Sequence, residues 1–186
     1  MNQPTPTNRG KSIRHGDFDT LCDALDYAAL CETGLIFFDG RARLKESLTY
    51  KNLRIKSQAL AKRLVPFAAK NSRIGLAAVT TPEFAIIFMA CQYAGLVPAP
   101  LPLPVTLGGR NSYERQLQRL ADTGDFHALF CPESMQQIMG SALNDKAIPV
   151  MSFEDLEKLP DGNELRPFDK DDLCYIQYSS GSSSSP

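Results

Sequence analysis

Small hydroxyl residues gather at one end of the sequence. Six of the last eight residues are serine, and they follow a run, 173–178, whose composition is typical of a β-strand. A Ser/Gly loop that leaves a strand of an α/β sheet suits phosphate groups, because small residues let backbone N–H groups approach closely and the hydroxyls add donors. The candidate phosphate-binding residues are Ser179, Ser180, Gly181, Ser182 and Ser183.

Two other interpretations of this serine-rich end have to be weighed. It is not a Walker A loop, because no Gly-Lys-Ser/Thr follows the glycine. By composition alone it also fits a flexible serine-rich linker. The strand that precedes it is what favours the phosphate-binding interpretation.

Strand-like runs and helical patterns alternate along the rest of the chain, which predicts an α/β fold with a mainly parallel sheet flanked by helices. We expect helices from about residue 18 and over 49–66, 84–93, 113–122 and 132–143, with Thr49 and Thr81 as N-caps and Gly95 as a stop. We expect strands over 34–38, 46–48, 74–79, 127–131, 148–152 and 173–178.

Three stretches depart from this alternation. Residues 97–104 alternate proline with apolar residues, which predicts an extended segment with few ladder bonds. Residues 154–172 are rich in acids and predict a short helix followed by an exposed connector. Residues 1–16 are polar, lack the apolar core of a secretory signal, and predict a disordered tail.

Composition excludes several classes of function. Twenty basic residues against 21 acidic ones give a net charge of −1, which does not favour a generic nucleic-acid binder. Five cysteines without CxxC spacing and only two histidines favour neither a disulfide framework nor a metal site, so we expect structural thiols in a reducing, cytoplasmic compartment. No apolar run is long enough to predict a membrane span.

A basic face is expected on the helix over 49–66. It is either an ordinary solvated surface or a landing patch for an anionic carrier or nucleotide. Its members are Lys51, Arg54, Lys56, Lys62 and Arg63.

Several motifs together resemble the adenylate-forming (AMP-binding) enzymes. The run from Gln177 to Ser183, with Pro186 three positions later, is similar to their phosphate-binding signature, usually Tyr-Thr-Ser-Gly-Ser-Thr-Gly-x-Pro-Lys-Gly. Upstream, 47–53 is similar to their "LTY-x-x-L" helix start, and 90–100 to the "AG-x-V-x-x-P" landmark. The landmarks come in family order. The Gln-Tyr before the loop, the variant at 93–95, the Pro-rich stretch at 101–104 and the segment at 108–113 most resemble the fatty acyl-AMP ligases.

This resemblance implies an enzyme that joins a fatty acid to AMP, using ATP, and passes the acyl group to an acyl carrier protein. It implies that residues 17–186 are an incomplete N-terminal adenylation domain that ends inside the phosphate-binding loop. The Mg²⁺ ligands, the adenine contacts and the catalytic lysine would lie beyond Pro186. The chain would therefore carry no catalytic or metal-binding residue and would be inactive alone.

Three alternatives stay open at this point. A long-chain acyl-CoA ligase uses the same chemistry with another acceptor. A truncated, non-catalytic adenylation-like domain would act as a binding module; whether the gene product continues past Pro186 would separate this reading from the enzyme. An unrelated α/β domain with a serine-rich tail would have to produce the three landmarks by chance. An unfinished sheet is also expected to expose an edge strand and apolar surface.

Overall fold

A computed structural model describes residues 14, 16–104 and 109–178 of the chain. Its helices are α1 (Leu21–Ala28), α2 (Tyr50–Phe67), α3 (Pro82–Ala94), α4 (Gly109–Gly124), α5 (Glu133–Ala142) and α6 (Phe153–Leu156). Its strands are β1 (Gly34–Phe38), β2 (Leu44–Thr49), β3 (Arg73–Ala77), β4 (Val97–Leu101), β5 (Phe126–Cys131) and β6 (Val150–Ser152). The tail expected over 1–16 lies almost wholly outside the described residues.

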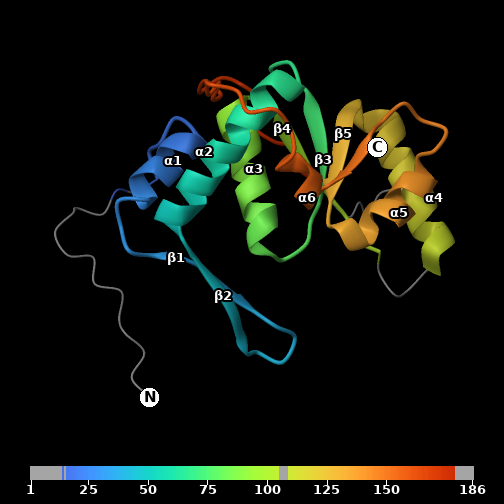
Figure 1. Ribbon diagram of the computed structural model, residues 1–186, viewed down its shortest axis with the longest axis horizontal. Helices are drawn as coiled ribbons and strands as arrows, with labels where there is room; N and C mark the ends of the chain where they lie inside the picture. The colour runs from blue at the N-terminus through green and yellow to red at the C-terminus, as the bar shows by residue number, and fades with distance from the viewer. Residues whose placement is uncertain (1–13, 15, 105–108, 179–186) are drawn as a thin grey trace.

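A parallel sheet of four strands forms the centre of the molecule, in the order β4-β3-β5-β6 (Figure 1). The central position of β3 explains its small residue: a Cβ atom on Gly75 would approach Leu101 and Leu129, from both neighbouring strands, to 2.9 Å. The predicted α/β class with a mainly parallel sheet is confirmed.

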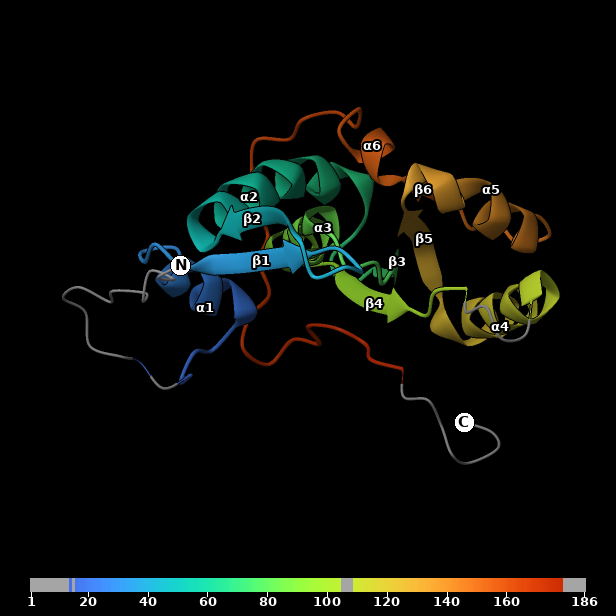
Figure 2. The same cartoon turned by 90° about the horizontal axis from the view of Figure 1, so that it is seen from below.

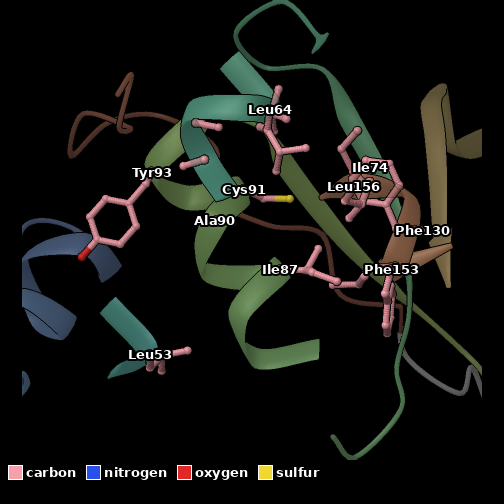
Figure 3. Packing of buried hydrophobic residues seen from close by; sticks show 14 of the residues in the cluster. Leu53, Leu64, Ile74, Ile87, Ala90, Cys91, Tyr93, Phe130, Phe153 and Leu156 are labelled. Atoms are coloured by element: carbon pink, nitrogen blue, oxygen red, sulfur yellow. The ribbon is translucent and has the colours of Figure 1, made fainter. Parts of the chain in front are cut away.

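Helices cover both faces of this sheet. α1, α2 and α3 lie on one side and α4 and α5 on the other (Figure 1). Successive strand residues point to opposite faces, so Ile74 and Leu76 pack into one core while Ala77 and Leu129 pack into the second. Figure 3 shows Cys91 pointing from α3 into the first core, among Leu64, Ile74 and Leu156.

The predicted helix signals act as expected. The side chains of Thr49 and Thr81 accept hydrogen bonds from the backbone at the starts of α2 and α3. Gly95 ends α3 in the left-handed conformation, with φ of 63°. α2 runs one residue beyond the predicted end, because Pro66 lies in its last turn without stopping it.

A hairpin of β1 and β2 stands apart from the parallel sheet (Figures 1 and 2). The prediction of two short strands around a turn is confirmed, although β2 begins earlier than expected. Leu35 and Leu48 face the first core, whereas Ile36, Phe38 and Leu44 are exposed on the outer face.

Two predictions about extended segments were wrong in an informative way. The first five residues of the proline-rich stretch, β4, form a parallel ladder with β3, and the expected shortage of ladder bonds concerns the outer edge of that strand. Residues 173–178, expected as a strand, belong to neither sheet. The second result follows from the prolines of β4, which have no N–H to offer to a neighbour on that outer edge.

No helix among the described residues is long and apolar enough to cross a membrane.

Candidate functional site

The five candidate phosphate-binding residues, Ser179, Ser180, Gly181, Ser182 and Ser183, lie outside the described residues. The structure describes the chain up to Tyr178, the residue before them. The site is therefore defined by what positions Tyr178. That task falls to residues 159–178, here called the return segment, which leads from α6 back across the molecule (Figure 2).

The return segment is first fixed to α2. The Arg63 guanidinium donates to the Leu159 carbonyl at 2.5 Å, and the Gly162 amide donates to the Lys62 carbonyl at 3.1 Å. An added Cβ on Gly162 would lie only 2.5 Å from the same carbonyl oxygen. The connector expected to be merely exposed is thus attached to the domain by close backbone contact.

Arg166 forms the next attachment, at the ends of two helices. Its guanidinium donates to the Ala94 carbonyl at 3.0 and 3.1 Å and to the Ala68 carbonyl at 2.8 Å. Ala94 ends α3 and Ala68 caps α2, so a cation lies where both helix dipoles are negative. The Arg166 amide also donates to the Tyr93 carbonyl at 2.9 Å, which fixes the backbone as well.

Ion pairs with Lys70 follow, just before the start of β3. The ammonium lies 2.8 Å from Asp172 and 3.3 Å from Asp169. These hydrogen bonds raise the pKa of Lys70, and the same contact lowers the pKa of Asp172. The side chains of Lys70 and Asp172 are partly solvated, so these ion pairs contribute little to the free energy of unfolding.

The last residues of the return segment run beside β4. The Ile176 amide donates to the Pro98 carbonyl at 3.0 Å, and the Tyr175 ring packs against Phe88 of α3 with centroids 5.9 Å apart. The chain passes from Asp172, at the amino end of the strands and near the C-terminal end of α3, to Tyr175 beside Phe88 in the middle of that helix. It therefore runs in the same direction as β4, as Figure 2 shows.

This direction places the end of the return segment toward the carboxyl edge of the parallel sheet. Ile176 and Tyr178 pack against the second core, and burial raises the pKa of the Tyr178 phenol. Ligands of open α/β sheets bind outside the carboxyl ends of their strands. The candidate serines thus follow directly on a segment that is aimed at the usual ligand-binding edge.

The cysteines are consistent with structural thiols. Cys22, Cys91 and Cys131 are buried, and burial raises the pKa of each thiol to about 12, so none is an activated nucleophile at neutral pH. Among the described residues, no group of three His, Cys, Asp or Glu side chains is arranged to hold a metal ion.

The basic face of α2 is partly used inside the molecule. Arg54 donates to Asp26 of α1 at 2.6 Å, and Arg63 holds the return segment. Two of its five cations therefore join elements together, a role that neither a solvated surface nor a landing patch had implied.

An apolar pocket of about 410 Å³ lies between α1, β1, α2 and α3. Leu25, Leu35, Leu53, Phe88 and Met89 are among the residues that line it. No described lining residue is charged, so the pocket offers no cation that would recognise a phosphate or carboxylate. It does not belong to the candidate site.

Sequence reasoning missed two residues that hold the return segment, Arg166 and Gln92. Gln92 donates from its side-chain amide to the Cys174 carbonyl at 2.6 Å. Its signal in the sequence was a single carboxamide in a helix that has no other polar side chain after Glu83 in the first turn, apart from the phenol of Tyr93. Arg166 is one of three cations in the acidic stretch, and only the folded arrangement singles it out.

Comparison with known proteins agrees with this fold. The family model described as AMP-binding enzyme matches residues 28–186. A Caulobacter vibrioides protein, whose name provisionally assigns it as an acyl-CoA synthetase, is 38% identical over 185 residues, which cover 98% of this chain and 32% of that protein. The medium-chain-fatty-acid–[acyl-carrier-protein] ligase JamA of Moorena producens is 30% identical over 91% of this chain and 30% of its own length.

Solved structures show the same relationship. A structure from a study of fatty acyl-adenylate ligases of E. coli and L. pneumophila superimposes with a TM-score of 0.86 at 38% identity, over 91% of this chain and 31% of that one. The L. pneumophila ligase in complex with acyl adenylate and pyrophosphate, at 20% identity and a TM-score of 0.68, shares the fold over 89% of this chain and 29% of that one. The chain spans about a third of the length of these relatives. It belongs to the family of AMP-binding enzymes.

Proposed function

We propose that the full-length protein activates a fatty acid with ATP, giving an acyl-adenylate and pyrophosphate, and that residues 17–186 are the first part of its larger N-terminal domain. The observation that supports this proposal is the course of the return segment, which runs beside β4 toward the carboxyl edge of the sheet and ends at Tyr178, the residue before the candidate serines in the sequence. The similarity to fatty acyl-adenylate ligases supports the choice of substrate.

The proposed reaction explains the need for the serines. A carboxylate oxygen of the fatty acid attacks the α-phosphorus of ATP, the bond from that phosphorus to the bridging oxygen breaks, and pyrophosphate leaves with the electron pair. Charge accumulates on phosphate oxygens, so preorganised donors contribute most. We assign this role to the hydroxyl and N–H groups of Ser179, Ser180, Gly181, Ser182 and Ser183, which would hold the β- and γ-phosphates.

We propose Mg²⁺ as the metal that neutralises the pyrophosphate charge, with ligands beyond Pro186. The buried thiols of Cys22, Cys91 and Cys131 fit a reducing compartment, and we therefore propose the cytoplasm as the place of the reaction.

We propose an acyl carrier protein as the acceptor of the acyl group. JamA, a relative at 30% identity, is named as a ligase of this kind. The name of the Caulobacter relative favours coenzyme A instead. Incubating the full-length enzyme with fatty acid, ATP and either acceptor distinguishes the two: thioester on the carrier protein supports the proposal, and thioester on coenzyme A contradicts it.

The serines are tested by changing two of them in the full-length protein. Ser180→Ala with Ser182→Ala removes two hydroxyl donors, and we expect fatty-acid-dependent ATP–pyrophosphate exchange to fall at least about tenfold, since one lost donor to developing charge costs about 10²-fold in comparable sites. The control is Ser112→Ala with Ser141→Ala, two exposed serines on α4 and α5, which should keep full exchange. Unchanged exchange in the first variant would remove the loop from the mechanism.

A further inference from the structure

The outer edge of β4 can accept hydrogen bonds but not donate them. Val97 donates to the Ser72 carbonyl at 2.9 Å, on the β3 side, and Ala78 donates to the Leu101 carbonyl at 3.1 Å. Because alternate residues of a strand direct their N–H and C=O groups to opposite neighbours, Pro98 and Pro100 face the other side. Proline has no N–H, so any chain placed on that edge lacks donors from β4.

The return segment lies on this edge, and its Cys174 carbonyl lacks a backbone donor from β4. The Ile176 amide donates to the Pro98 carbonyl, which sets the register. In a parallel ladder with that register, the carbonyl two residues earlier, that of Cys174, would accept from the N–H of residue 98. Pro98 cannot supply it.

Gln92 supplies the missing donor. Its Nε2 atom lies 2.6 Å from the Cys174 carbonyl oxygen. Gln92 is only 1% exposed, and the other buried residues of α3 are apolar apart from the phenol of Tyr93. A buried carboxamide is unfavourable unless it is hydrogen-bonded, so this contact accounts for a polar residue at that position.

We propose that Gln92 is a positioning residue for the phosphate-binding loop. Its carboxamide takes the part of the N–H that Pro98 lacks, fixes Cys174 to the end of α3 beside β4, and so sets the place of Tyr178, the residue before Ser179. This inference rests on the proposed function of the serines. Displacement of a binding group by about 1 Å can cost about 10²-fold in rate. Loss of the Gln92 hydrogen bond is therefore expected to slow the reaction with ATP, although Gln92 itself does not contact ATP.

The test replaces the donor and keeps the volume. In the full-length protein, Gln92→Met should lower kcat/KM for ATP about tenfold or more, while KM for the fatty acid changes by less than about twofold. The matched control is Gln118→Met: Gln118 of α4 also donates to a backbone carbonyl, that of Ala142, at 3.0 Å. Its loss should lower stability without changing the ATP kinetics.

A rescue experiment separates positioning from general stability. Pro98→Ala restores a backbone N–H at the place where Cys174 needs one. Added to Gln92→Met, it should recover most of the lost kcat/KM for ATP. It should also slow the hydrogen exchange of the Ile176 amide, which Gln92→Met alone should make faster. Absence of rescue, or wild-type ATP kinetics in a folded Gln92→Met variant, would overturn the proposal.

Two further results bear on the role of Gln92. If Gln92→Met is not recovered folded, Gln92→Asn, which withdraws the donor by one methylene, takes its place, and unchanged ATP kinetics then overturn the positioning role. If Ser180→Ala with Ser182→Ala leaves exchange unchanged, the loop has no role and the positioning role is overturned with it. Loss in the serine variant without loss in Gln92→Met overturns only the role of Gln92.

Discussion

Single residues decide where the return segment can lie. Gly95 has a φ of 63°, and a Cβ atom there would lie 2.5 Å from the Arg166 carbonyl oxygen. Gly140, inside α5, has nothing within 4 Å of the same position. The two glycines therefore differ in purpose: one allows a left-handed turn under a crossing backbone, and the other has no such constraint.

This difference predicts opposite effects of the same substitution. Gly95→Ala should lower the free energy of unfolding by about 2 kcal/mol, from left-handed strain together with displacement of the return segment. Gly140→Ala should raise it by about 0.5–1 kcal/mol, because alanine is the better helix residue. Urea unfolding of both variants measures this, and equal effects of the two would contradict the assigned contact at Gly95.

At the scale of elements, local sequence signals were sufficient to predict those helix ends that depend only on residues close by in the chain. Thr49, Thr81 and Gly95 mark helix ends by local hydrogen bonding and backbone conformation, so their roles could be predicted from the sequence. The absence of a strand at 173–178 could not be predicted in this way, because strand formation depends on the neighbouring strand, and the neighbour here, β4, has prolines on the facing edge. The attachments of the return segment join residues 72 to 102 positions apart, which no periodic pattern in the sequence can reveal.

The attachment at Arg166 predicts a measurable link between elements. Arg166→Met leaves two helix-end carbonyls without their charged donor, and we expect a loss of about 2–3 kcal/mol in the free energy of unfolding. Arg166→Lys keeps the charge but not the double contact and should recover part of it. Lys170→Met, an exposed cation on the same segment, is the control. A loss at Arg166 no larger than that of the control would show that the contacts contribute nothing.

For the whole molecule, the distribution of apolar surface decides how this chain behaves when it is produced alone. Ile36, Phe38 and Leu44 are 61%, 59% and 65% exposed and share the outer face of the β1–β2 hairpin, where Phe38 and Leu44 are directly paired. The return segment adds Leu173 and Tyr175 on its open side. Contiguous apolar surface of this kind favours association.

We therefore expect the 186-residue chain to associate as its concentration rises, measured by light scattering after size-exclusion chromatography. Ile36→Thr with Phe38→Thr keeps β-propensity on the hairpin while removing much of its outer apolar surface, and should shift association to higher concentration. Leu30→Thr, a change at an equally exposed residue outside the hairpin, should leave association nearly unchanged. Equal effects of the two variants would show that association does not depend on the hairpin. The exposed apolar residues of the return segment would then be the next to replace.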